Sequence, residues 1–489
     1  MTMNNILYKI SLFSAVVLLG GFTTILTGCS DYTEIQPKGK NLLQTTGEIE
    51  GLLNIEYGTA NPDVRVMAGD IVKTFSNVAS DISNPSKTRN IILITWDEAN
   101  QETMADLTGS DSDYDDFYSI IGGICNPILQ QVDQAQGDEA KKKQLKSEAL
   151  LMRGYYHFLL VNKFAKAYNA STAANDGGII YMTEDVDITV PQSPKSVKEV
   201  YELCLKDINE AISLDGLPKD AINRMRMNKA SAYAAKAVVL VAMQDWEQAE
   251  AAAKQALQLN PTVTDYTQML HQPITGYFIG NRYDAMMRTK LECEEDLFYT
   301  YNQEYFNFIV AESAERIEKG NYAYEKLAVD RMFYDYMMGM GSMYIGLDYT
   351  ATWDMESGWN YEGLKTSYLY CIIAECEQHK GNINAAMEAI DKVRVCRIDP
   401  SGYQPLKGNV TDNAIAIDYI KKTWSGEGMW SWYNFLCRKR WTQVDGYKET
   451  LTKEMNGITY SLKPDSKFWV FPFPKNVTDK NPNLKQNYR

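Results

Sequence analysis

Positive charge is what this sequence most clearly lacks. Its 49 lysine and arginine residues are outnumbered by 63 aspartate and glutamate residues, which gives a formal net charge of −14. Binding to nucleic acid depends on neutralising phosphates, and basic side chains are also what attracts a protein to an anionic surface. We therefore expect no nucleic-acid partner and no electrostatic attachment to a membrane.

Motifs of catalysis are missing as well. Only three histidines occur, His157, His271 and His379, and none has a partner at the spacing of an HExxH zinc motif. No GxSxG turn, Walker A loop or GxGxxG loop is present. Adjacent carboxylates such as Glu294 and Glu295 say nothing about the separation across a bound sugar that glycoside hydrolysis needs. We therefore predict no catalytic activity and no cofactor, with a lipid-anchored glycoside hydrolase as the less favoured alternative.

The cysteines do not form a recognisable framework. No CxxC occurs, and seven cysteines follow Cys29, an odd number that suits neither a set of disulfides nor a zinc site. We expect mostly buried free thiols, with one disulfide left open. The acidic run between Asp111 and Asp116 lacks EF-hand spacing, and such a run is more often a solvated helix start than a calcium site. We therefore predict no metal site.

Long apolar runs are absent except at the N-terminus. The run from Ile10 to Leu26 is shorter than the roughly 20 residues of a membrane-spanning helix and contains two glycines, as a secretory signal peptide does. The residues Leu26-Thr27-Gly28-Cys29 match a bacterial lipobox, in which the cysteine becomes the lipid attachment point. We therefore expect a signal peptide over residues 1–28, with palmitate-type acyl chains on Cys29 as the membrane anchor.

Helical repeats are what the sequence does contain. Residues 227–261 and 364–400 each show two amphipathic helices with small residues at the offsets of a tetratricopeptide unit, and a third pair is split between 142–168 and 196–218. A further helix is expected over 114–132, kinked at Pro127. Three stacked pairs are enough to bury a continuous core.

The remaining segments interrupt this helical period. Residues 262–363 mix glycine, tyrosine, tryptophan and methionine with few clear helices. We therefore predict a mainly α fold, in which tetratricopeptide-like repeats (an α-α superhelix) pack against an irregular, loop-rich lobe with little β structure. The expected regions after the signal peptide are 29–261, a ligand-binding loop region at 262–363, and 364–489 with a proline-rich tail.

Several motifs together resemble one family, the SusD-like (RagB/SusD) outer-membrane nutrient-binding lipoproteins. Besides the lipobox and the repeats, the matching residues are Ala149, Leu150, Arg153, Tyr156, Phe158, Glu427, Gly428, Trp430, Pro472, Pro474, Asn481, Pro482, Leu484, Gln486 and Asn487. Met429 departs from the pattern, because the family usually has an arginine there. Since that position looks structural in the family, the change bears on local packing.

The resemblance implies a passive binding protein. It implies attachment to the outer membrane through the lipid anchor, facing the cell exterior, and a partner SusC-like TonB-dependent transporter. The implied ligand is an oligosaccharide or, in some members, a peptide. A scaffold whose repeat groove binds another protein remains an alternative.

Nine tryptophans and 32 tyrosines suggest where a ligand binds. An exposed aromatic ring can cover the apolar face of a sugar, while nearby polar groups pair with its hydroxyls, and such residues gather on loops carried by a rigid scaffold. The candidates in the irregular segments are Asp81, Asn84, Trp96, Tyr277, Asn281, Arg282, Tyr283, Trp353, Trp359 and Tyr361. Each of these aromatic rings could instead be loop core, and Trp246 and Trp469 are expected to be structural.

Overall fold

The computed structural model describes residues 43–59, 61–72, 82, 84–267, 293–302, 306–324, 349–353, 360–429, 431–455 and 457–487. The chain divides into two units, residues 1–43 and 44–489, and the fold below is that of the second unit. Within the described residues, none of the helices combines the length and the apolar character needed to cross a bilayer.

Short helices form the N-terminal part of this unit. They are α2 (Thr46–Leu53), α3 (Asp63–Met67), α5 (Arg89–Thr95), α6 (Gln101–Leu107), α7 (Ser112–Ile120) and α8 (Asn126–Gln131), with a 3-10 turn at Glu98–Asn100. The helix expected over 114–132 is present as α7, a π-helical turn at Ile121–Cys125, and α8. Because Pro127 has no amide hydrogen to donate, the π turn just before it absorbs the interruption.

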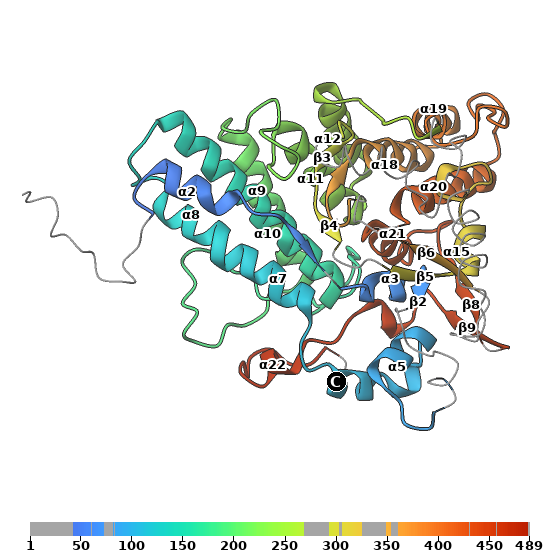
Figure 1. The fold of residues 1–489 in the computed structure, drawn as a ribbon, viewed down its shortest axis with the longest axis horizontal. Coiled ribbons are helices and arrows are strands. Elements are labelled where there is room, and N and C mark those ends of the chain that lie inside the picture. The colour runs from blue at the N-terminus through green and yellow to red at the C-terminus, as the bar shows by residue number, and fades with distance from the viewer. Residues whose placement is uncertain are drawn as a thin grey trace, which may run out of the picture. The chain divides into compact units, whose positions relative to one another are not determined.

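Three helix pairs form the predicted repeat core. They are α9 (Glu139–Phe164) with α10 (Val197–Ser213), α11 (Lys229–Ala242) with α12 (Trp246–Leu259), and α18 (Thr366–His379) with α19 (Ile383–Arg394). The members of each pair pack against each other, and α10 with α11 and α12 with α18 join successive pairs (Figure 1). Helices α20 (Asn413–Gly428) and α21 (Tyr433–Trp441) follow. The mainly α, tetratricopeptide-like prediction is therefore confirmed.

Small side chains explain the close packing of the second pair. Ala237 on α11 and Ala249, Ala253 and Ala256 on α12 are fully buried. Trp246, at the start of α12, stacks on His379 of α18 with ring centroids 3.9 Å apart, which joins the second pair to the third. Trp246 thus has the structural contact that the sequence predicted for it.

His157 fixes the connection between α9 and α10. Its ring is fully buried and stacks on Tyr181 at 3.8 Å between centroids. Its Nε2 lies 2.9 Å from the amide nitrogen of Met182, and its Nδ1 lies 2.9 Å from the carbonyl oxygen of Arg153. The ring therefore accepts at Nε2 and donates at Nδ1, and burial lowers the pKa of His157 to about 3. This is a packed, neutral histidine.

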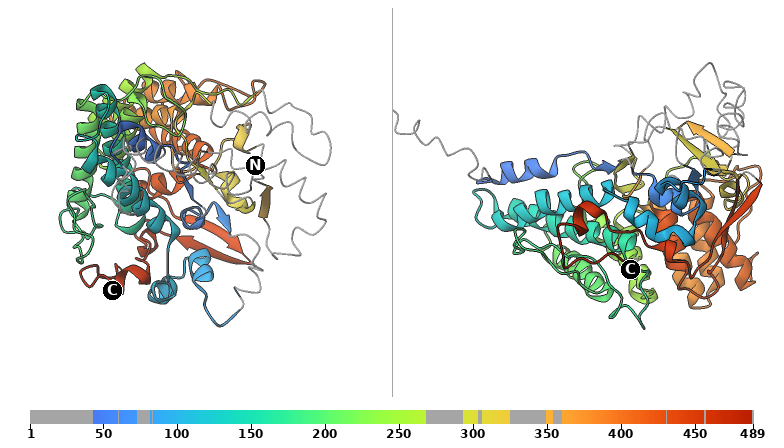
Figure 2. Two further views of the ribbon diagram at one scale, coloured as in Figure 1. Left: turned by 60° about the vertical axis from the view of Figure 1, so that its left-hand side comes forward. Right: turned by 90° about the horizontal axis from the view of Figure 1, so that it is seen from below.

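The β structure is limited to short pairings. β1 (Gly58–Thr59) pairs with β4 (Tyr301–Asn302) in parallel, and β3 (Asp296–Phe298) pairs with β7 (Leu364–Lys365) antiparallel. β2 (Ile71–Val72), β5 (Phe306–Val310) and β6 (Tyr349–Trp353) form an antiparallel sheet, and β8 (Leu451–Met455) with β9 (Ile458–Leu462) forms a hairpin. Between β5 and β6 lies the short helix α15 (Ala311–Glu315). In the right-hand view of Figure 2, β5 and β6 are the yellow and orange arrows above the C-terminal helices.

The C-terminal tail is held by amide side chains. Nδ2 of Asn487 donates to the carbonyl oxygens of Phe164 and Phe471, both at 2.7 Å. Gln486 bonds both backbone groups of Phe473, at 2.9 and 2.8 Å. The tail also carries a 3-10 turn at Lys467–Trp469 and the short helix α22 (Lys475–Thr478). The motif residues of the tail therefore anchor it to the end of α9.

Two further expectations are confirmed. The seven cysteines after Cys29 are free thiols, and five of them are buried. Trp469 is buried, and its indole nitrogen donates to the carbonyl oxygen of Lys463 at 2.9 Å, so this ring is structural.

A glycine sets the distance between α9 and α10. A Cβ at Gly154 would lie 2.9 Å from the backbone oxygen of Cys204 on α10 and 3.1 Å from a side-chain carbon of Ile208. Gly154→Ala should therefore lower the free energy of unfolding by about 1–3 kcal/mol, measured by denaturant titration. The matched control is Gly51→Ala in α2, where a Cβ meets nothing within 4 Å. This change should raise the free energy by about 0.5–1 kcal/mol, and equal effects at the two sites would contradict the close approach.

Candidate functional site

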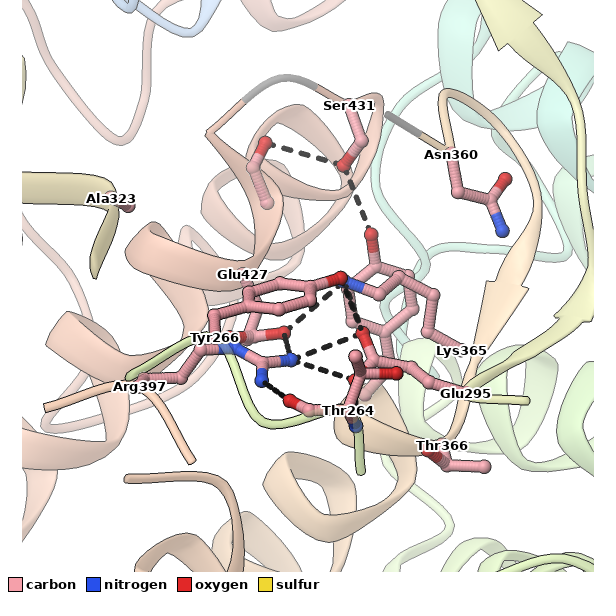
Figure 3. A network of polar contacts seen from close by, with 12 residues as sticks. Thr264, Tyr266, Glu295, Ala323, Asn360, Lys365, Thr366, Arg397, Glu427 and Ser431 are labelled. Atoms are coloured by element: carbon pink, nitrogen blue, oxygen red, sulfur yellow. Dashed lines mark hydrogen bonds and ion pairs between the residues drawn. The ribbon is translucent and has the colours of Figure 1, made fainter. Parts of the chain in front are cut away.

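A buried group of charges lies where the irregular region joins the repeats (Figure 3). We call Tyr266, Glu295, Lys365, Arg397 and Glu427 the Arg397 cluster. The guanidinium of Arg397 donates to Glu295 Oε2 at 2.8 Å and to Glu427 Oε1 at 2.6 Å. The ammonium of Lys365 lies 2.8 Å from Glu295 Oε1 and 3.3 Å from Glu427 Oε2. Arg397 also covers the ring of Tyr266, with 4.0 Å from Cζ to the ring centroid.

Each member stands where the chain leaves or re-enters the helical core. Arg397 lies three residues beyond α19, and Glu427 lies in the last turn of α20. Tyr266 follows α12, Glu295 precedes β3, and Lys365 ends β7. The Arg397 cluster therefore ties together the segments that enter and leave the region predicted at 262–363.

Backbone hydrogen bonds reinforce this junction. The amide nitrogen of Tyr322 donates to the carbonyl oxygen of Arg397 at 2.7 Å, and that of Thr366 donates to the carbonyl oxygen of Glu295 at 3.0 Å. The guanidinium of Arg397 reaches the carbonyl oxygen of Thr264 at 2.5 Å. The junction is thus fixed by main-chain as well as side-chain contacts.

The charges of the Arg397 cluster compensate one another. Burial alone would raise the pKa of Glu427, but Arg397 and Lys365 lower it to about 2. The pKa of Glu295 is also lowered, because the same two cations outweigh the effect of burial. A cavity of about 10 Å³ beside the cluster has room for no more than one water molecule. The cluster therefore positions the adjoining segments, and the cavity that its described residues line is too small for a sugar.

A second buried ion pair holds the sheet of the irregular region. The segment 61–70 contains α3 and leads directly into β2, whose partner β5 pairs in turn with β6. Asp70 is fully buried and accepts from Arg438 Nη1 at 2.6 Å and from Asn434 Nδ2 at 3.1 Å. Arg438 also donates to the carbonyl oxygen of Ala68. Helix α21 thereby fixes segment 61–70, and with it one edge of the sheet.

Two of the predicted ligand residues are part of this support. Trp96 is 4% exposed, and its Nε1 donates to the carbonyl oxygen of Met67 at 3.1 Å. Tyr361 is 0% exposed, and its hydroxyl donates to the carbonyl oxygen of Asn61 at 2.7 Å. The expectation that these rings lie exposed on loops is wrong, because both polar tips bond to segment 61–70 and the rings fill the space around it. They position the sheet and present no free ring face.

The other predicted residues are only partly described. Asn84 is exposed and accepts from the amide nitrogen of Ser86 at 2.9 Å in a tight turn. Trp353 ends β6 opposite Phe306 of β5, and its side chain lies outside the described atoms. The residues outside the described range are Cys29, Asp81, Tyr277, Asn281, Arg282, Tyr283 and Trp359. The structure therefore connects Trp96, Trp353 and Tyr361 through segment 61–70 and its sheet.

Sequence reasoning missed the charged residues of this junction. Arg397, Lys365 and Asp70 were not singled out, and Glu427 was noted only as a motif residue. The available signal was a charged residue close to each end of the irregular segment, and such charges are rarely buried without a partner.

Removing the central cation should unfold the junction. Arg397→Met leaves two buried carboxylates with only Lys365, so we expect the free energy of unfolding to fall by about 3–5 kcal/mol in denaturant titration. The matched control is Lys407→Met, which breaks a pair with Glu388 in which both side chains are about half exposed. That change should alter stability by less than about 1 kcal/mol. A similarly small effect for Arg397→Met would refute the anchoring role.

Asp296 should make stability depend on pH. Burial raises its pKa to about 7, although Lys365 opposes the shift, whereas an aspartate in an unfolded chain titrates near about 3.9. The folded state therefore holds this proton more tightly, so the stabilisation is complete below pH ~4 and is lost as the pH rises through 7. Wild-type stability should fall more between pH 5.5 and 8.5 than that of Asp296→Asn, as measured by denaturation midpoints.

The exposed Asp220 is the matched position for this experiment, because its side chain stays in water in the folded state. Asp220→Asn should keep the wild-type pH dependence. If Asp296→Asn shows the same slope as the wild type, Asp296 does not hold its proton in the folded protein.

Two family models together match most of the chain. A SusD-like family model described as "Starch-binding associating with outer membrane" matches residues 32–240. A second model, described as the SusD family, matches residues 271–489. No curated protein sequence matches significantly.

Several solved structures share the fold. A SusD superfamily protein from Bacteroides thetaiotaomicron gives a TM-score of 0.62 at 16% identity, covering 91% of this chain and 100% of that one. A SusD-like protein from Bacteroides fragilis gives 0.62 at 14%, covering 90% and 95%. A laminarin binding SusD-like protein gives 0.53 at 15%, covering 91% and 99%.

At these identities the structural matches establish the architecture, and the sequence models establish the family. The two models leave only residues 1–31 and 241–270 unmatched, and the second of these gaps includes all of helix α12 of the repeat core. The chain belongs to the SusD family.

Proposed function

We propose that this protein captures nutrient oligosaccharides at the cell surface and passes them to a SusC-like TonB-dependent transporter, without catalysing a reaction. The observation that carries the proposal is the match of both family models, one of which is described as starch-binding and associated with the outer membrane. The laminarin-binding relative shows that this fold can hold a glucan. Oligosaccharide is therefore favoured over peptide as the ligand.

The proposal also assigns a role to the lipid anchor and to each region of the chain. Cys29 would carry the lipid, residues 1–28 would be removed as the signal peptide, and the body would face the cell exterior. The first family model begins at residue 32, three residues after the proposed anchor. Residues 29–261 and 364–489 would form the scaffold, and residues 262–363 would supply most of the ligand contacts.

The geometry that supports the proposal is a helical scaffold that holds the ends and the sheet of the irregular region. The Arg397 cluster fixes the ends of that region, and the pair of Asp70 with Arg438 fixes its sheet. β6 carries Trp353 at its end, next to the segment that contains Trp359. Binding residues commonly lie on loops held by such a scaffold, so these two rings are the proposed stacking residues together with Tyr277 and Tyr283, beside the polar Asp81, Asn84, Asn281 and Arg282.

Calorimetry tests the proposal. The ligands are neutral glycans, including laminarin and starch oligosaccharides, and peptides. We expect the wild type to bind at least one glycan without turning it over. The double variant Trp353→Ala with Trp359→Ala should bind that glycan roughly tenfold or more weakly, because each stacking ring contributes on the order of 1 kcal/mol. Trp246→Phe, a conservative change of a ring in the repeats, should keep wild-type affinity.

Other results would reject the proposal. Binding to peptides with silence across the glycans would point to a peptide carrier. Turnover of a bound glycan that one carboxylate substitution abolishes would identify a hydrolase. If the wild type binds no small ligand and the double variant still binds a protein partner, the protein is a scaffold.

A further inference from the structure

An aromatic ring and two cations surround one glycine beside β2. Gly69 has φ +73°, a left-handed conformation that favours glycine. The position of a Cβ on Gly69 would lie 3.1 Å from a ring carbon of Trp96 and 3.5 Å from Nη1 of Arg316. The ammonium of Lys453 lies 3.7 Å from the centroid of the same Trp96 ring. We call Trp96, Arg316 and Lys453 the Gly69 cluster.

Lys453 is buried without an ionic partner. It points inward from β8, between the buried Leu451 and Met455, and is 0% exposed. Within the described part of the chain its Nζ has no hydrogen-bond partner. The face of Trp96 lies beside it, and the carboxylates of Glu312 and Asp70 favour its charge only from beyond hydrogen-bond distance. A buried ammonium in this state is unfavourable. Burial first and Arg316 second therefore lower the pKa of Lys453 well below its usual value.

Arg316 provides the accessible side of the Gly69 cluster. It is half-buried and follows α15. Its guanidinium donates to the carbonyl oxygen of Gly69 at 3.2 Å and to that of Thr452 at 2.9 Å, and no described carboxylate forms an ion pair with it. Two backbone carbonyls orient this cation without neutralising it.

The carboxylates around the Gly69 cluster have other partners. Asp70 accepts from Arg438 and Asn434, Glu312 accepts from the amide nitrogen of Glu454 at 2.5 Å, and Glu449 pairs with Lys421. Among the described residues, none of these three carboxylates therefore forms a hydrogen bond with Arg316 or Lys453.

A further unpaired cation belongs to segment 61–70. Arg65 on α3 is fully buried, and the three nitrogens of its guanidinium have no hydrogen-bond partner among the described residues. Two buried basic side chains, Arg65 on α3 and Lys453 on β8, therefore have no hydrogen-bond partner among the described residues.

We propose that Arg316 and Lys453 form a subsite for an anionic substituent, the carboxylate or sulfate group of an acidic sugar. This proposal rests on the glycan-binding function above and narrows its ligand class. The planar donors of Arg316 suit bidentate contact with such a group, and the Lys453 ammonium gains the counter-ion that it lacks. Trp96 forms the floor of the subsite, below the ammonium.

Calorimetry with three probes tests the subsite: polygalacturonate oligosaccharides, sulfated dextran oligosaccharides and neutral laminarin oligosaccharides. The wild type should bind one of the two acidic probes at least tenfold more tightly than laminarin, and which one distinguishes carboxylate from sulfate. Lys453→Met and Arg316→Gln should each weaken that acidic probe at least tenfold while changing laminarin binding less than twofold. Lys463→Met, at an exposed lysine just after β9, is the matched control and should behave as the wild type.

Two further readouts separate a binding role from a structural one. Without ligand, Lys453→Met should raise the unfolding midpoint, because a buried unpaired ammonium is replaced by an apolar side chain of similar shape. Binding an anion should favour the protonated amine, so affinity for the acidic probe should increase as the pH is lowered. The pH dependence should be absent in Lys453→Met, which keeps Arg316, Arg438, Asp70, Glu312 and Glu449.

Each remaining outcome overturns the subsite. Equal affinity of the wild type for acidic and neutral glycans would reject it and leave the proposed function standing. A preference for acidic glycans that both variants keep would place the anion elsewhere. Binding to acidic peptides alone, or to none of these probes, would reject both the subsite and the glycan function.

Discussion

The position of the irregular region depends on one arginine held between two carboxylates. Arg397 lies between Glu295 and Glu427, and its contact with Glu295 spans 102 residues of sequence. A buried ion pair adds little to stability when compared with an apolar replacement, but losing one partner is costly. An alternative packing in which Arg397 did not reach Glu295 and Glu427 would leave these charges buried and unpaired. The cluster therefore selects one way of joining the irregular region to the repeats.

The repeats make this selection possible by bringing distant segments to one place. Arg397 follows α19 and Glu427 lies in the last turn of α20, so the packing of the third pair with α20 decides where both charges lie. Segment 61–70 is fixed in the same way by α21 through Asp70 and Arg438. A mainly helical scaffold thus determines the geometry of a region that has little regular structure of its own.

The helical scaffold could be predicted from the periodicity of the sequence. Contacts between residues far apart in the sequence could not be predicted. Small residues such as Ala249 and Ala253 repeat at helical spacing, so the second helix pair can be read locally. The burial of Trp96 and Tyr361 could not be predicted in this way. It depends on contacts with segment 61–70, which lies far from Tyr361 in sequence. Aromatic content marked these two rings as exposed ligand contacts, whereas both are buried. Composition cannot separate the two cases, because a tryptophan or tyrosine is the same residue whether it stacks on a ligand or supports a strand.

Paired and unpaired charges in this protein have different roles. In the Arg397 cluster each ion is matched, and the adjoining cavity has room for no more than one water molecule, so the contacts of the described residues serve to position other parts. Lys453 is buried to the same degree, but its Nζ has no hydrogen-bond partner among the residues that the structure describes. Burial disfavours the charged form of Lys453, so this amine has no evident structural role in the ligand-free fold. Its position is explained most simply if an anion that favours its protonated form arrives with the ligand.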